Sequence, residues 1–168
     1  MPYAQLLAAD LPSSARGDMP EPLPRVDSLA AYGLRVSRHF AQCRREGGQL
    51  ALLWIEIDVR ARQSSAASDA ALDCLVQIVS LRLRNRVRGA DDVQRVGEHS
   101  FAVLLLAAGA REAEVAEQRL LHTVRGAYNV DGQVIQVSAR LGTAVFPLAG
   151  RNGTELAEAA RNSLDAAG

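Results

Sequence analysis

Two carboxylates near the middle of the chain have a spacing that could support chemistry. Glu56 and Asp58 follow an apolar run that begins at Gln49, and residues two apart on a strand project from the same face. Two carboxylates on one face could act as a general acid and a general base. The sequence offers no nucleophile or substrate cradle beside them, so the pair alone defines no reaction.

A second pair of charged residues, Arg88 and Asp91, follows a helical pattern. The chain has 19 arginines, no lysine and 19 acidic residues, so any anion site must be local and built from arginine. Arg88 could contribute to such a site. It could equally be a cation in the last turn of a helix, with Gly89 as the cap and Asp91 as a turn former. Both interpretations remain open on these residues alone.

Histidines and cysteines do not complete either pair. His99 falls in a turn, whereas His39 and His122 belong to separate helical patterns, and no metal-ligand spacing connects the three. Cys43 and Cys74 have no CxxC spacing and lie in apolar helical patterns. This placement predicts buried, reduced thiols.

Charge and hydropathy restrict where the chain can act. The net charge of zero gives no general attraction to nucleic-acid polymers or anionic membranes. The apolar runs 49–57 and 101–108 are far shorter than a membrane span, and residues 1–11 lack the basic segment of a signal peptide. We therefore expect a cytoplasmic protein that does not insert directly into a membrane.

The elements that must position these residues follow from periodicity. Prolines concentrate before residue 26, so residues 1–25 are expected to be a flexible Pro-rich tail or linker and residues 26–168 one domain. Helical spacing predicts helices over residues 29–47, 72–88, 113–124 and 154–166, and apolar runs predict strands over 49–58, 93–96, 101–106, 128–130 and 134–146. Asp131-Gly132 between the last two strands is a strong hairpin signal. The order predicts an α+β domain with a mixed, largely antiparallel sheet and helices on its faces.

Several motifs in register carry a resemblance to a known family. Its members have Asp-x-Asp at a strand end, Phe-Lys-x-x-Asn-Asp, a Gly-Asp helix start, Arg-x-x-Asp, and a Gly-Gly-Asp/Glu-Glu-Phe hairpin five residues later. The corresponding segments here are Glu56-Ile57-Asp58, Arg60-Ala61-Arg62-Gln63-Ser64-Ser65, Leu72-Asp73, Arg88-Gly89-Ala90-Asp91 and Gly97-Glu98-His99-Ser100-Phe101. The chain thus resembles the GGDEF, diguanylate cyclase-like, domain family over roughly residues 27–167, which implies about five strands plus a small hairpin.

The same resemblance implies that the catalytic residues are missing. Family metal ligands correspond to Glu56 and Ser100, and a serine hydroxyl is a poor replacement for a carboxylate. Glu98 replaces a glycine that approaches the nucleotide, and His99 replaces an acid. Ala61 and Ser64 replace phosphate-binding and guanine-binding residues, whereas Asp73 is retained. We therefore expect no diguanylate cyclase activity, no catalytic residue, no metal site and no bound magnesium.

The resemblance also implies a product-binding site that survives. In active members the Arg-x-x-Asp motif binds cyclic di-GMP, and Arg88 and Asp91 keep both its residues and its spacing to the hairpin. A further arginine comes from the helix after the hairpin, where Arg119 matches and Arg86 and Arg125 are alternatives. A guanidinium can pair with phosphate and with the O6/N7 edge of guanine.

Three functional hypotheses follow. The first is a cyclic di-GMP receptor that signals to a protein partner, with the ligand able to link two copies into a homodimer. The second is a ligand-free scaffold domain that binds partners through its surface. The third is a GTP-binding regulatory domain, or a slow cyclase, that uses Glu56, Asp58 and Asp73.

Overall fold

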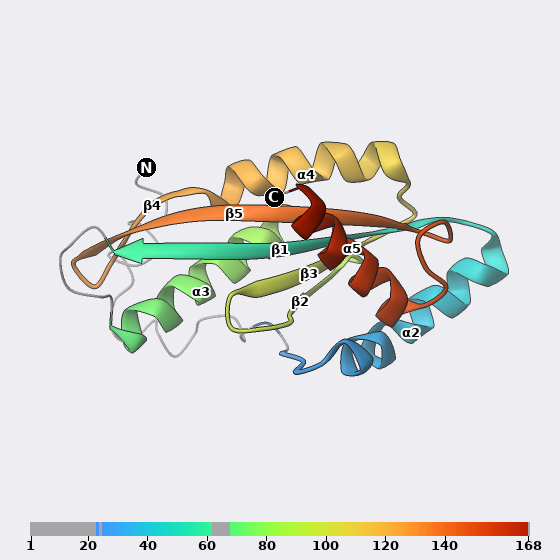
Figure 1. Ribbon diagram of the computed structural model, residues 1–168, viewed down its shortest axis with the longest axis horizontal. Coiled ribbons are helices and arrows are strands. Elements are labelled where there is room, and N and C mark those ends of the chain that lie inside the picture. The colour runs from blue at the N-terminus through green and yellow to red at the C-terminus, as the bar shows by residue number, and fades with distance from the viewer. Residues whose placement is uncertain (1–22, 24, 62–67, 168) are drawn as a thin grey trace.

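The protein folds as one antiparallel sheet with a pair of helices on each face (Figure 1). The computed structural model describes residue 23, residues 25–61 and residues 68–167. The predicted tail, residues 1–25, and Ser64 therefore lie largely or wholly outside the described residues. The elements in chain order are α2 (Leu29–Glu46), β1 (Leu50–Ala61), α3 (Asp69–Asn85), β2 (Asp92–Arg95), β3 (Ser100–Leu106), α4 (Ala110–Val124), β4 (Gly126–Val130), β5 (Gln133–Phe146) and α5 (Gly153–Ala167).

The sheet has the strand order β2-β3-β1-β5-β4, with β1 at its centre. Every neighbouring pair of these strands is antiparallel. The predicted α+β class is confirmed, and the mixed character is confined, among the described residues, to one isolated parallel bridge between Arg25 and Arg95. The five expected strands are all in this sheet, and the described residues contain no additional small hairpin.

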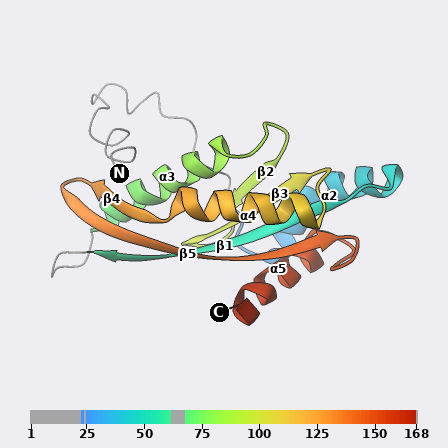
Figure 2. The same ribbon diagram turned by 90° about the horizontal axis from the view of Figure 1, so that it is seen from above.

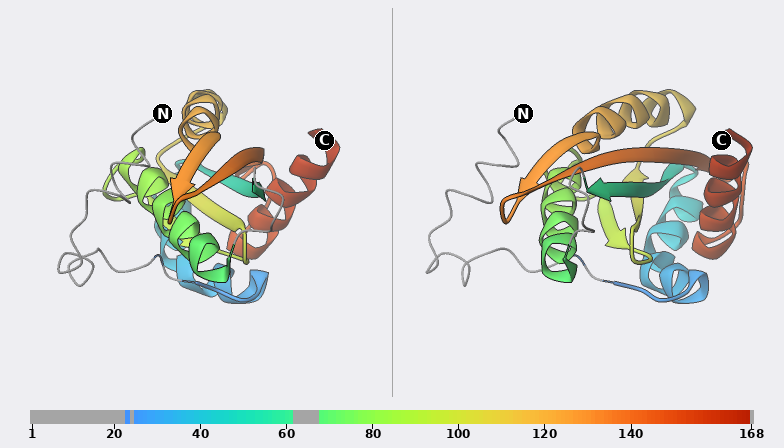
Figure 3. Two further views of the ribbon diagram at one scale, coloured as in Figure 1. Left: turned by 90° about the vertical axis from the view of Figure 1, so that its left-hand side faces the viewer. Right: turned by 60° about the vertical axis from the view of Figure 1, so that its left-hand side comes forward.

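Alternating residues of β1 enter two separate cores. Ala51, Leu53 and Ile55 pack under α3 and α4, whereas Leu52 and Trp54 pack under α2 and α5. Figure 2 shows α3 and α4 on one side of the sheet and α5 on the other, and Figure 3 gives the same layers end on. A strand buried on both faces needs a continuous apolar run, which explains the sequence of β1 up to Ile55.

The first helix begins and ends where the sequence predicts. The hydroxyl of Ser28 accepts a hydrogen bond from the backbone N–H of Ala31 at 3.0 Å, and Gly47 closes the helix in the left-handed conformation at φ 71°. In the β4–β5 hairpin, Asp131 and Gly132 have φ angles of 51° and 78°, as a tight hairpin turn requires.

The predicted end of the second helix is wrong. α3 ends at Asn85 with Arg86 as its C-cap, not at Arg88-Gly89. The backbone N–H of Arg88 donates to the Asp91 carboxylate at 3.0 Å instead of continuing the helix. Arg88 therefore lies in the loop beyond the helix, and its interpretation as a cation in the last helical turn does not apply.

Candidate functional site

An arginine of α3 donates two hydrogen bonds to the loop between α3 and β2. Arg84 donates from Nη1 to the carbonyl of Asp91 at 2.6 Å and from Nη2 to the carbonyl of Gly89 at 2.7 Å. The N–H of Asp91 also donates to the carbonyl of Arg88 at 3.0 Å, which closes the turn. A loop with its carbonyls satisfied in this way is ordered before any ligand arrives.

Asp91 fixes the same loop to strand β3. Its side chain is 2% exposed, and Oδ1 accepts from the backbone N–H of Leu106 at 3.0 Å while Oδ2 accepts from the N–H of Arg88. The Arg88 guanidinium pairs with this carboxylate at 3.4 Å and donates to the Leu106 carbonyl, yet its side chain stays 63% exposed. Asp91 thus orients Arg88 while leaving its outer surface open to solvent.

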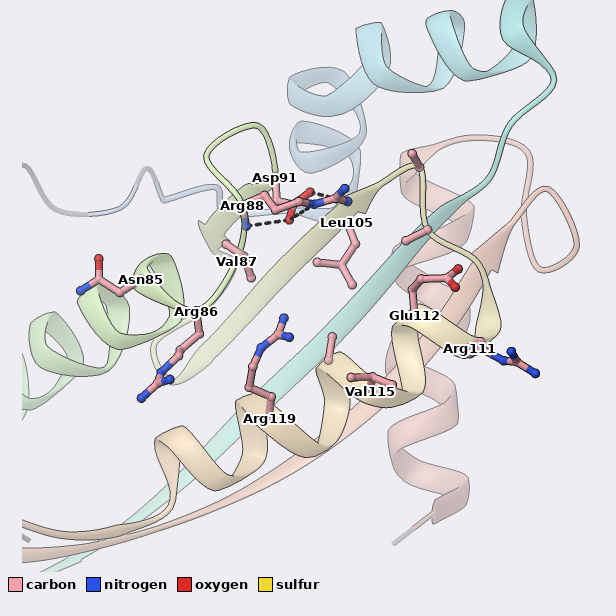
Figure 4. A pocket seen from close by; sticks show the side chains of 13 residues that line it. Asn85, Arg86, Val87, Arg88, Asp91, Leu105, Arg111, Glu112, Val115 and Arg119 are labelled. Carbon is pink, nitrogen blue, oxygen red and sulfur yellow. Dashed lines mark hydrogen bonds and ion pairs between the residues drawn. The ribbon is translucent and has the colours of Figure 1, made fainter.

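The orientation matters because Arg88 borders a pocket of about 680 Å³ between this loop and helix α4. The pocket brings together Arg88, Asp91 and Arg119, which the sequence analysis grouped as one site. Figure 4 shows Arg119 projecting from α4 into the space beside the Arg88–Asp91 pair. A volume of this size falls within the range of small-molecule sites, roughly 300–1,000 Å³.

The pocket is richer in arginine than the three predicted residues. Arg86 and Arg111 also line it, so the pocket lining contains four arginines and two carboxylates, Asp91 and Glu112. Within the described part of the chain, the guanidinium groups of Arg86, Arg111 and Arg119 make no hydrogen bond or ion pair. Three unpaired cations at one concave surface favour an anionic ligand.

Arg111 was missed in the sequence, although a signal for it was present. Arg111, Val115 and Arg119 recur every four residues along α4, which places all three on one helix face. Val115 is 60% exposed, and the buried Leu105 and Ala116 also line the pocket. The pocket therefore combines cations with a small apolar area, as the flat, apolar face of a nucleobase would require.

The paired carboxylates lie on the opposite face of the sheet. Glu56 on β1 pairs in register with Ser100 on β3 and with Arg140 on β5, so the three cross the sheet in one row. Glu56 accepts from Arg140 Nη2 at 3.2 Å and from Trp54 Nε1 at 3.2 Å, while Asp58 pairs with Arg60 at 3.2 Å. A cavity of about 330 Å³ is lined by Glu56, Asp58 and Arg140. Trp54 itself is buried in the core under α2 and α5.

The turn 97–100 between β2 and β3 is closed by Arg95. Its guanidinium donates to the carbonyls of Gly97 at 3.0 Å and Glu98 at 2.6 Å. Partial burial and then the charge of Arg25 lower the pKa of Arg95, and Asp73 and Glu98 oppose this shift. Asp73 lies near the start of α3, and Glu98 is exposed in the turn.

The remaining candidate residues lie elsewhere. Arg125 donates to the carbonyl of Ala139 at 2.9 Å and lines a different pocket with His122, so it does not join the Arg88 site. Among the described residues neither Cys43, which is buried, nor Cys74, which is partly buried, forms a disulfide. In the described ranges, no group of three or more His, Cys, Asp or Glu side chains is arranged to hold a metal ion. None of the helices described is long and apolar enough to cross a membrane.

The fold is an α+β domain in which two pairs of helices cover one antiparallel sheet. The family model described as "Diguanylate cyclase, GGDEF domain" matches residues 27–168, so the chain belongs to the GGDEF family. Two relatives from Pseudomonas aeruginosa are similar in sequence. The diguanylate cyclase TpbB is 30% identical over 141 residues, and the cyclic di-GMP phosphodiesterase NbdA is 29% identical over 140 residues.

These matches cover most of this chain and a small part of each relative. The alignments span 83% of this chain and 32% of TpbB, and 80% of this chain and 18% of NbdA. The crystal structure of the TpbB GGDEF domain superimposes with a TM-score of 0.73 at 28% identity, covering 86% of this chain and 89% of that domain. The GGDEF domain of FimX, also from P. aeruginosa, has the same fold, with a TM-score of 0.70 at 19% identity over 83% of this chain and 87% of that domain. The chain is therefore a GGDEF domain related to proteins of cyclic di-GMP signalling.

Proposed function

We propose that this domain is a catalytically inactive member of its family that binds cyclic di-GMP between the 86–91 loop and α4. The observation that carries the proposal is the convergence of Arg88, Asp91 and Arg119 on one pocket, with Arg88 already oriented by a buried carboxylate. Pre-ordering reduces the entropy that a ligand must overcome, and so raises affinity without new contacts.

The chemistry of the pocket suits the proposed ligand. Cyclic di-GMP carries two phosphodiester anions and two guanines. Guanidinium groups bind phosphate through paired hydrogen bonds and can also stack on a base plane. Arg88 and Arg119 are assigned to these contacts, and the apolar surface of Val115 and Leu105 is assigned to the base.

The turn that replaces the family hairpin supports the proposed loss of catalysis. Joining two GTP molecules requires metal ions that neutralise developing charge on the phosphates. Ser100 stands next to Glu56 where the resemblance expects a second carboxylate, and Glu98 adds a negative charge to the exposed turn. We therefore expect no cyclic di-GMP from GTP and magnesium in a direct product assay.

Isothermal titration of cyclic di-GMP into the original chain and three variants tests the proposed site. Arg119→Ala removes a side chain without any partner in the described structure, so the variant should fold normally and yet lose roughly tenfold or more in affinity. Arg88→Ala should reduce affinity further. Arg35→Ala, an exposed arginine on α2, is the charge-matched control and should bind like the original chain. Equal affinity of Arg119→Ala and Arg35→Ala would place the ligand elsewhere.

To act as a receptor, the domain must change its interaction with another protein when cyclic di-GMP binds. The pocket is open to solvent, so a ligand bound in it could contact a second copy of the domain. Ligand binding would then favour the dimer by mass action. The proposed partners are thus cyclic di-GMP, a protein that reads its occupancy, and a second copy of this domain.

A further inference from the structure

The row formed by Ser100, Glu56 and Arg140 differs from a metal site in both charge and hydrogen bonding. It lies on the α2 and α5 face of the sheet, directly after Trp54, the last β1 residue in the core under these helices. The family resemblance assigns metal binding to positions 56 and 100. Ser100 supplies a neutral hydroxyl there, so Glu56 is the one carboxylate left in the row.

Glu56 is not available as a free ligand. Its side chain is 32% exposed, and each of its oxygens already accepts a hydrogen bond, Oε1 from Arg140 and Oε2 from the indole of Trp54. Magnesium requires near-ideal octahedral geometry and oxygen donors that approach to about 2.0–2.1 Å. A metal at Glu56 would have to displace the guanidinium or share the carboxylate with it, and two cations so close repel each other.

We propose that Arg140 takes the place of the divalent cation in this family fold. Its guanidinium neutralises Glu56 from within the chain, and the site therefore rejects magnesium and any nucleoside triphosphate that depends on magnesium for its charge balance. Arg140 is thus a specificity-determining residue, and the domain is insensitive to GTP through this side chain. The inference concerns the face opposite the Arg88 pocket and does not rest on cyclic di-GMP binding.

The single tryptophan of the chain provides a direct probe. Trp54 is the only Trp residue, and its indole N–H donates to Glu56. In a ¹⁵N-labelled sample its side-chain N–H gives one resonance. Manganese(II) bound at Glu56 would broaden that resonance strongly, because the paramagnetic ion and the indole N–H would share the same carboxylate. Manganese(II) prefers the same oxygen ligands as magnesium.

Four proteins are compared to distinguish the effect of the Arg140–Glu56 pair from that of a change in net charge. In the original chain, millimolar manganese should leave the indole resonance at full intensity. Arg140→Ala should lose more than half of that intensity, and Arg140→Ala combined with Glu56→Gln should recover it. Arg60→Ala removes an equal charge that pairs with Asp58 and not with Glu56, and should behave like the original chain.

Two results would overturn the inference. Broadening in the original chain would show that the site accepts divalent cations despite Arg140. An unchanged indole resonance in a folded Arg140→Ala protein would show that Arg140 is not what excludes them. If Arg140→Ala fails to fold, Arg140→Gln serves in its place, since it retains a polar side chain without charge, and thermal melting verifies folding for each variant.

Discussion

Asp91 shows how one buried carboxylate can shape a whole site. It accepts two backbone N–H groups, from Arg88 and Leu106, and pairs with the Arg88 guanidinium while itself 2% exposed. Asp91→Ala leaves both N–H groups without their acceptor, and hydrogen bonds to charged groups contribute about 1.5–3 kcal/mol each. We expect the free energy of unfolding in urea to fall by about 2–4 kcal/mol.

The control for this prediction is Asp58→Ala. Asp58 is also a carboxylate paired with an arginine, but its side chain is 62% exposed and the pair is on the surface. Exposed ion pairs contribute about 0–1 kcal/mol, so this variant should unfold almost like the original chain. Equal stability losses in the two variants would mean that Asp91 is not a structural anchor.

Two buried tyrosines differ in how their hydroxyl groups are satisfied. The Tyr128 hydroxyl donates to the Val124 carbonyl at 2.5 Å and accepts from Arg82 at 3.1 Å, whereas the Tyr32 hydroxyl has no hydrogen-bond partner among the described residues. Removing an unsatisfied hydroxyl eliminates a desolvation cost, so Tyr32→Phe should be neutral or stabilising by about 1 kcal/mol. Tyr128→Phe should destabilise by a similar amount, and a reversed order in thermal melting would contradict this account.

The same residues set a pH dependence with a definite sign. Burial raises the pKa of Tyr32, helped by Asp92, and burial also raises the pKa of Tyr128 against the opposing effect of Arg82. The tyrosines of the unfolded chain therefore lose their protons at a lower pH than those of the folded protein. Their contribution to the free energy of unfolding is fully present below about pH 10 and falls as the pH rises beyond it. The loss between neutral and alkaline pH should be smaller in Tyr32→Phe, as measured by urea unfolding at each pH.

At the scale of elements, the close approach of α5 to β5 depends on one glycine. A Cβ atom at Gly142 would lie 2.0 Å from the Ala160 carbonyl oxygen and 2.5 Å from the Leu164 nitrogen, both backbone atoms that cannot rotate away. Gly142→Ala should therefore shift α5 and cost about 3 kcal/mol or more of unfolding free energy. Gly89→Ala is the matched control, because nothing lies within 4 Å of its Cβ position. Equal melting temperatures for the two variants would contradict this packing.

The elements themselves could largely be predicted from local pattern. Ser28 and Gly47 define a helix through its caps, and Asp131-Gly132 defines a hairpin through its turn chemistry. The end of α3 could not be predicted, because a tertiary contact decides it. Asp91 is fixed to β3 by the N–H of Leu106, and its carboxylate also accepts the N–H of Arg88 in the loop that follows the helix.

The candidate site shows the same limit. The family resemblance was sufficient to group Arg88, Asp91 and Arg119, and the structure places all three at one pocket, although their role in binding stays a prediction. Arg140 gave no signal, because its pairing with Glu56 depends on the register between β1 and β5, which are far apart in the sequence. Long-range register follows from packing of the whole sheet and has no local pattern.

At the scale of the whole molecule, the sheet separates two charged regions that differ in how their charges are paired. The face under α3 and α4 carries a pocket with unpaired arginines, and the opposite face carries carboxylates that arginines already neutralise. Unpaired cations can gain a ligand, whereas paired carboxylates have little to gain from a metal. We therefore predict a domain that responds to a cyclic dinucleotide without magnesium and does not respond to GTP.

Isothermal titration of the original chain in magnesium-free buffer tests this claim most directly. Cyclic di-GMP should bind with micromolar or tighter affinity and raise the melting temperature, because a ligand that binds the folded state alone stabilises it. GTP with magnesium, titrated into the same protein, should give no binding heat. No heat and no stabilisation with cyclic di-GMP would contradict the account and leave a scaffold domain whose Arg88 serves only to close a loop.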